Sequence, residues 1–139
     1  MPSPQKRSHK VSQVRELPLT DMVSHMREES PNECVGLIFE TGPPFRLVNQ
    51  ARSTKRFYVG TTQVSEALED RGEAVVATYH SHPNGPLVAS GEDESFMAFL
   101  SLAWPGVIHV ILSDSGYVTY HVTDDLEIEQ IECQTHDLS

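Results

Sequence analysis

The chain has 139 residues, of which 38% are apolar and 22% charged, so it is large enough for one globular domain with its own core. Its formal net charge of −10 repels phosphate backbones and excludes nucleic acid as the main partner. No apolar run approaches the length needed to cross a bilayer, so a membrane is excluded as well.

The first ten residues, MPSPQKRSHK, are basic and have no apolar stretch behind them, so they do not form a secretory signal. We expect a disordered basic tail over residues 1–10 and a single domain over residues 11–139, in the cytoplasm. The two cysteines, Cys34 and Cys133, are a lone pair far apart in sequence, which does not indicate a disulfide framework. No histidine is placed beside Cys34 by the sequence, which argues against a nucleophilic thiol.

The first half of the domain mixes strands and helices. Residues 11–17 fit a strand, and Pro18 opens a helix that ends near residue 30. Its apolar stripe predicts a core-facing side and consists of Leu19, Met22, Val23 and Met26. The segments that follow are predicted as a buried strand over 34–40, a paired strand over 45–51, an extended stretch over 55–60 and a helix over 61–72.

The second half begins with a valine-rich strand over 74–82, which the turn Pro83-Asn84-Gly85-Pro86 ends. A helix is expected over 92–104, a hairpin over 107–113 and 116–122, and an alternating edge strand over 126–134. Because hairpins stand at both ends of this mixture of strands and helices, the sequence predicts an α/β or α+β sandwich with a mixed sheet.

Two histidines at the end of the strand over 74–82 have the spacing of metal ligands. Residues i and i+2 of a strand point to the same face, about 6.6 Å apart, so His80 and His82 can converge on one ion. A catalytic zinc takes three protein ligands and keeps the fourth position for water. Asp93 follows a loop that can turn back, so it is the obvious third ligand.

Each of these residues also has a purely structural interpretation. Most His-x-His pairs are surface or core histidines, and Ser90 followed by Asp93 fits a helix capping box. Glu33 taken alone is a solvated carboxylate at the start of a strand. The remaining histidines have no ligand spacing and are interpreted as surface or structural residues: His9, His25, His109, His121 and His136.

The joint pattern favours the metal site, because it resembles the JAMM motif of the MPN-domain (JAB-domain) metalloproteases. A distant Glu33 is followed by His80-Ser81-His82-Pro83 and then by Ser90-x-x-Asp93, which fills the spacing H-x-H-x7-S-x2-D. The resemblance covers the chain from about Val11 to about Glu132. It implies a cytidine-deaminase-like three-layer α/β sandwich, with a mixed sheet flanked by helices.

The resemblance also implies a mechanism. His80, His82 and Asp93 would hold one Zn²⁺ per chain, with water as the fourth ligand. Glu33 would be the general base, and Ser90 would hydrogen-bond the oxyanion of the tetrahedral intermediate. The implied activity is hydrolysis of a peptide or isopeptide bond at the C-terminal tail of a ubiquitin-like or sulfur-carrier protein. The compact chain is similar to the short prokaryotic and phage members of the family.

Two alternatives stay open at this point: a peptidase of phage tail assembly, and a non-catalytic MPN scaffold that binds protein partners. The complete ligand set argues against the scaffold. A zinc nucleoside deaminase is excluded, because it needs His-x-Glu and Pro-Cys-x-x-Cys, and a His-Glu-x-x-His protease is excluded for want of that motif. We expect an extended substrate tail to add as a strand beside the cleft. The sequence gives no indication of oligomeric state.

Overall fold

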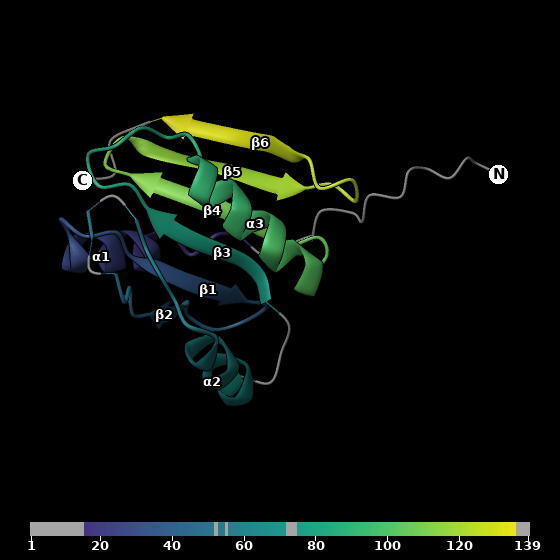
Figure 1. Cartoon of the computed structure of the whole chain (residues 1–139). Coiled ribbons are helices and arrows are strands. Elements are labelled where there is room, and N and C mark those ends of the chain that lie inside the picture. Colours follow the sequence, from purple (N-terminus) through teal and green to yellow (C-terminus); the bar gives the residue numbers. More distant parts are fainter. Residues whose placement is uncertain (1–15, 52, 55, 72–74, 136–139) are drawn as a thin grey trace.

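The structure, a computed structural model, describes residues 16–51, 53–54, 56–71 and 75–135 (Figure 1). The basic tail expected over residues 1–10, and most of the strand expected over residues 11–17, lie outside the described residues. Residues 16–18 lead into the first helix without strand structure. No helix among the described residues is both long and apolar enough to span a membrane.

A six-stranded mixed sheet forms the centre of the molecule, in the order β2-β1-β3-β4-β5-β6. The strands are β1 (Val35–Phe39), β2 (Phe45–Leu47), β3 (Val75–Ser81), β4 (Ile108–Ser113), β5 (Gly116–Val122) and β6 (Ile128–Thr135). Among these strands β3 and β4 pair in parallel, and the other neighbours pair antiparallel. The mixed sheet, the hairpins β1–β2 and β4–β5, and the edge position of β6 are therefore confirmed.

Helices cover both faces of this sheet. Helix α1 (Leu19–Glu29) packs on one face through Met22, Val23 and Met26, as its apolar stripe predicted. Helices α2 (Thr61–Arg71) and α3 (Gly91–Ala103) lie on the other face, with α2 beside the β2 end and α3 across the middle strands (Figure 1). The result is the three-layer sandwich that the resemblance implied.

Strand β3 lies between the two helical layers, and all seven of its residues are buried. A strand enclosed on both faces needs a nearly continuous apolar sequence, which Val75, Val76 and Ala77 provide. Its second half is polar, with Thr78, His80 and Ser81 all buried. Buried polar groups are retained where hydrogen bonds or a bound ion satisfy them, so this half of β3 is where a functional site is to be sought.

Strand β2 is shorter than predicted, because a side chain takes over the hydrogen bonds of the following segment. The Asn49 side chain donates to the carbonyls of Glu33 and Arg56, at 3.0 and 3.1 Å. Its Oδ1 accepts from the amides of Ala51 and Tyr58, at 2.9 and 3.0 Å. These bonds hold Asn49, Ala51, Arg56 and Tyr58 in non-strand structure, whereas the sequence pattern predicted that the strand would continue to residue 51.

Candidate metal centre and active site

The strand register brings the predicted base and the two predicted ligands to one place. Val35 of β1 pairs with His80 of β3, so Glu33, just before β1, comes level with His82, just after β3. Alternation along each strand turns these three side chains toward the face that α3 covers. One ligand atom each from Glu33, His80 and His82 lies within 4.8 Å of the others, so these three residues could hold a metal ion.

Asp93, in the first turn of α3, completes the cluster. Its Oδ1 lies 3.1 Å from Nε2 of His80, and its Oδ2 lies 3.0 Å from Nε2 of His82. The two Nε2 atoms are 3.3 Å apart. The Asp93 carboxylate therefore faces both imidazoles, one oxygen to each, and these separations are comparable with the roughly 3.3 Å between ligand atoms of a tetrahedral metal ion.

The protonation of His82 shows that a positive charge is needed between His82 and Asp93. The Pro86 carbonyl can only accept, so Nδ1 of His82 donates to it at 2.9 Å. A neutral His82 therefore turns an unprotonated Nε2 toward the carboxylate oxygen of Asp93, and two acceptors face each other at 3.0 Å. Only a positive charge between them makes this contact favourable, and a proton or a metal ion can supply it. The donor set thus fits a divalent cation.

The pKa values of His80, His82 and Asp93 reflect the competition between burial and the contacts among these groups. Burial opposes the charge on His82, but the Asp93 carboxylate and the Pro86 carbonyl outweigh it and raise the His82 pKa. Burial lowers the pKa of His80 against the pull of Asp93. Burial also opposes ionisation of Asp93, yet hydrogen bonds from both histidines hold its pKa well below the usual range. Asp93 is therefore an anion facing two imidazoles, as a metal ligand has to be.

The capping box predicted from Ser90 and Asp93 exists as well. The Asp93 amide donates to Oγ of Ser90 at 3.0 Å, and the Ser90 amide donates to Oδ2 of Asp93 at 2.9 Å. The cap and the ligand interpretation are therefore compatible, because the cap fixes the carboxylate that faces the histidines. A charge-assisted bond from a backbone amide orients the ligand from outside the cluster.

Glu33 lies beside the cluster in an environment that makes it a weak acid. Its side chain is 3% exposed, and among the described residues its Oε1 is the buried side-chain atom without a hydrogen-bond partner. Burial raises its pKa to about 7; the charge of His82 pulls the pKa down, and those of Asp93 and Glu92 push it up. The interpretation of Glu33 as a solvated carboxylate is wrong, because the folded chain buries it against the histidines.

Neighbouring residues enclose the cluster. Phe57 packs on the His80 ring with centroids 4.6 Å apart, and on Phe96 of α3 at 4.7 Å. Ser81 faces away from the cluster, as predicted, and its Oγ accepts from the Cys34 amide at 2.8 Å. Burial raises the pKa of the Cys34 thiol to about 12, which agrees with the prediction that it is not a nucleophile.

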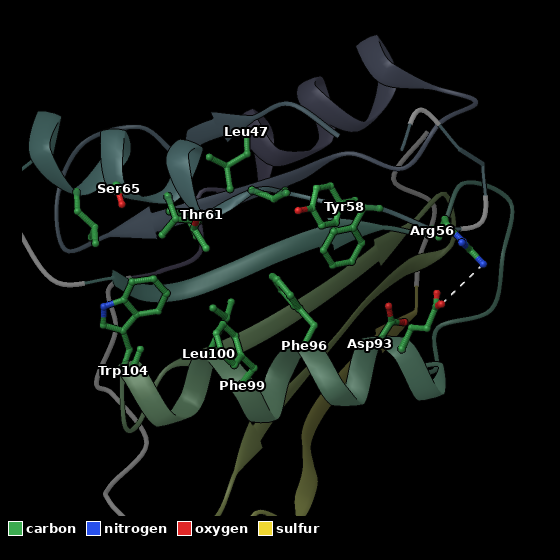
Figure 2. Close-up of a pocket in the computed structure, with 17 residues that line it drawn as sticks. Leu47, Arg56, Tyr58, Thr61, Ser65, Asp93, Phe96, Phe99, Leu100 and Trp104 are labelled. Atoms are coloured by element: carbon green, nitrogen blue, oxygen red, sulfur yellow. Dashed lines mark ion pairs between the residues drawn. The ribbon is translucent and has the colours of Figure 1, made fainter. Parts of the chain in front are cut away.

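Two hollows open beside the cluster. A cleft of about 420 Å³ is lined by Glu33, His82 and Ser90 together with the turn over residues 83–86. On the other side, an apolar pocket of about 490 Å³ lies between α2 and α3 and reaches Asp93. Figure 2 shows Phe96 and Leu100 of α3, and Trp104 just after it, facing Leu47, Tyr58 and Thr61 across this pocket, with the Arg56–Glu92 ion pair at one end.

Comparison with known families adds an independent finding. The family of prokaryotic homologs of the JAB domain matches residues 18–124, which include all five predicted site residues. The chain belongs to this family.

Relatives of the JAB-domain chain agree with its fold. A crystal structure of a JAB1/MPN domain protein from Archaeoglobus fulgidus has a TM-score of 0.51 and 19% identity, over 86% of this chain and 94% of that one. A solution structure of a protein from Desulfitobacterium hafniense has a TM-score of 0.60 and 22% identity, over 82% and 85% of the two chains. At these identities the similarity establishes the JAB/MPN fold alone.

One curated relative is a desampylase from Haloferax volcanii, 36% identical over 61 residues. The match covers 44% of this JAB-domain chain and 40% of the relative, so the chain matches less than half of that protein's length. The similarity is therefore local, and it enters the function of this chain only as support for a proposal.

Three residues of the site escaped the sequence interpretation. Phe57 lay in a stretch predicted only as extended, and Asn49 lay inside a predicted strand. His109 was grouped with the surface or structural histidines, and its imidazole is buried between Thr78 and Ser101. The signal for His109 was its position in the apolar run VIHVILS, where a lone polar residue on a buried strand requires partners.

Proposed function

We propose that this JAB-domain chain is a JAMM-type, zinc-dependent hydrolase of peptide or isopeptide bonds at the C-terminal tail of a ubiquitin-like protein. One observation carries the proposal: the Asp93 carboxylate approaches Nε2 of His80 and Nε2 of His82 at 3.1 and 3.0 Å, and the buried carboxylate of Glu33 lies beside them. The local similarity to a desampylase supports a ubiquitin-like modifier as the substrate class.

His80, His82 and Asp93 are the ligands that we assign to the ion. A zinc ion held there would supply a Lewis acid and would lower the pKa of a water molecule toward about 7. Two neutral imidazoles and one carboxylate are a ligand set that zinc accepts in catalytic sites. His82 donates to the Pro86 carbonyl and the Ser90 amide donates to Asp93, and these bonds orient two of the three ligands before the metal arrives.

Glu33 moves the proton in this mechanism. Its carboxylate accepts a proton from the attacking water and delivers it to the amine that leaves. Burial raises the Glu33 pKa to about 7 in the metal-free protein, so the folded environment favours proton uptake at this carboxylate. The unpartnered Oε1 supports this role, since it is a buried acceptor that no group in the described part of the chain satisfies. Water or substrate is then the partner for which this oxygen is kept free.

Ser90 stabilises the negative charge that develops on the substrate carbonyl oxygen. Its Oγ accepts from the Asp93 amide, and this leaves the hydroxyl proton available for donation. The side chain lines the same cleft as Glu33 and His82, so a substrate carbonyl in the cleft comes within its reach. A donor held in place by a helix cap needs little rearrangement when the charge appears.

The two hollows support a protein substrate. A narrow glycine-rich tail suits the cleft of about 420 Å³ that carries Glu33 and Ser90. The pocket of about 490 Å³ on the far side of Asp93 is apolar, and its rim exposes Tyr58 and Phe99. Apolar side chains of a partner protein would find contacts there, whereas a small polar metabolite would not.

The test combines metal content with cleavage. Purified protein should hold one zinc per chain, and should release a lysine peptide joined by an isopeptide bond to a ubiquitin-like protein ending in Gly-Gly. His82→Ala should lose both zinc and cleavage, whereas His121→Ala, outside the cluster, should keep both. Zinc without cleavage of this conjugate would favour the scaffold, and cleavage of peptidoglycan peptides alone would favour the phage-type peptidase.

A further inference from the structure

A chain of buried hydrogen bonds crosses the interior below the metal cluster. His109, on β4, is 2% exposed, and both of its ring nitrogens have partners. Its Nδ1 lies 2.8 Å from Oγ1 of Thr78, on the neighbouring strand β3. Its Nε2 lies 3.1 Å from Oγ of Ser101, on α3. One imidazole therefore connects both central strands to the helix above them.

The two hydrogen-bond partners of His109 lie on β3 and α3, the elements that carry the proposed ligands. Thr78 precedes His80 by two positions on β3, so both side chains point to the face covered by α3. Ser101 lies on α3, two helical turns after Asp93. The hydrogen bonds of His109 thus link the position of α3 along the sheet to β3, and with it the position of the Asp93 carboxylate.

Apolar packing holds α3 on the sheet through contacts that have no preferred direction. The buried apolar residues of α3 are Met97 and Leu100, and Phe96 packs on Phe57. A hydrogen-bonded imidazole adds a directional constraint, because its two bonds weaken steeply when their angles change. Burial, reinforced by the charge of His80, lowers the His109 pKa to about 3, so the ring is neutral. Both hydroxyl partners can donate or accept, and either tautomer is satisfied.

We infer that His109 is a positioning residue for the metal centre, because it holds α3 at the height where the Asp93 carboxylate meets His80 and His82. The inference rests on the proposed function in one respect, namely that these three residues bind zinc. It adds a residue that touches neither metal nor substrate. Ligand distances in zinc sites vary by only about 0.2 Å, so a small displacement of α3 is enough to weaken the site.

The decisive variant is His109→Leu, which keeps the volume and removes both hydrogen bonds. Zinc affinity, measured by competition with a chromophoric chelator, should fall about 10- to 100-fold in the folded protein. The visible absorption of the Co²⁺-substituted protein should also change, because it reports the ligand geometry directly. His109→Gln, whose longer side chain can still reach Ser101, should restore most of the affinity. His109→Asn, which can reach only Thr78, should not.

A matched control lies on the opposite face of the sheet. There His25 of α1 bonds to Tyr79 of β3, with Nδ1 2.7 Å from Oη, so a buried histidine again ties a helix to β3. Tyr79→Phe removes that tie and should lower the melting temperature while leaving zinc affinity and the Co²⁺ spectrum unchanged. A loss of stability by itself is thereby separated from a loss of position.

Smaller substitutions keep the test valid if His109→Leu does not fold. Ser101→Ala and Thr78→Val each remove one bond and should each weaken zinc binding severalfold. Wild-type zinc affinity in every folded His109, Ser101 and Thr78 variant would overturn the inference and leave the proposed function intact. A wild-type protein that binds no zinc would overturn the proposed function, and this inference with it.

Discussion

Replacing Glu33 by Gln separates chemistry from metal binding at the proposed centre. The amide fills the same space but cannot accept the proton of the attacking water. A general base contributes about 10²- to 10⁴-fold, so kcat should fall by that factor, equivalent to about 3–5 kcal/mol in the activation barrier. Zinc content should stay at one ion per chain, because the assigned ligands are His80, His82 and Asp93.

The same substitution should stabilise the metal-free protein, and the structure supplies the magnitude. Glu33 ionises near 4.5 in the unfolded chain and near 7 in the folded one, where burial opposes the charge. The unfolded chain loses its proton first, so stability falls as the pH rises from about 4.5 to 7. The full cost above pH 7 is about 3 kcal/mol as an upper bound. Gln is never ionised, and the variant avoids this cost.

Urea unfolding in EDTA, followed by fluorescence of the single tryptophan, Trp104, would measure this difference. At pH 8 the Glu33→Gln protein should be the more stable, and the difference should vanish below pH 4.5. Glu40→Gln, at an exposed position directly after β1, should change neither activity nor this pH dependence. Retained turnover in Glu33→Gln would remove Glu33 from the mechanism, and loss of zinc would make it a ligand. A variant less stable than wild type at pH 8 would refute the claim that burying the ionised Glu33 destabilises the folded protein.

Three further predictions concern other residues. Asp93→Asn should raise the Kd for zinc about tenfold or more while Glu33→Gln leaves it unchanged, and chelator competition would show the reverse order if Glu33 were the third ligand. Gly36→Ala should lower the free energy of unfolding by about 1–3 kcal/mol, because the added Cβ would overlap the Tyr79 ring. Gly91→Ala, with open space around it, should leave the free energy of unfolding unchanged. Equal stabilities of the two variants would contradict the overlap with Tyr79. Burial, aided by the charge of Arg46, lowers the His25 pKa to about 4, so the stability that His25 contributes to the metal-free protein should fall by about 3 kcal/mol as the pH falls from 6.5 to 4. A His25→Gln variant whose stability relative to wild type does not change over this pH range would disprove this origin.

Much of the fold could be predicted because its signals are local. The apolar stripe Met22, Val23 and Met26 specified α1 and its buried side, and turn residues separated the strands. The spacing of His80 and His82 fixed their shared face, since alternation is a property of any strand. The resemblance added Glu33, which no local pattern connected to residues far along the chain.

The rest depended on contacts between distant segments. The end of β2 is set by Asn49, whose side chain bonds to backbone groups on both sides of a loop, and this geometry exists only once the chain is folded. The burial of His25 and His109 likewise depends on hydroxyl partners that other elements supply, Tyr79 for one and Thr78 for the other. Spacing could say that neither histidine was a ligand, but it could not say what each one holds in place.

His82 and Asp93 stand at the two ends of one surface connection, eleven positions apart along the chain. A cation bound by both would close the connection into a small ring, much as a crosslink does, and would restrict the backbone between them. A protease must draw several residues of its target into an extended form, so it should cut the stretch over residues 83–89 readily in chelator and slowly in zinc. The rate of proteolysis in this stretch would then report the fraction of the protein that has metal bound, before any substrate is known.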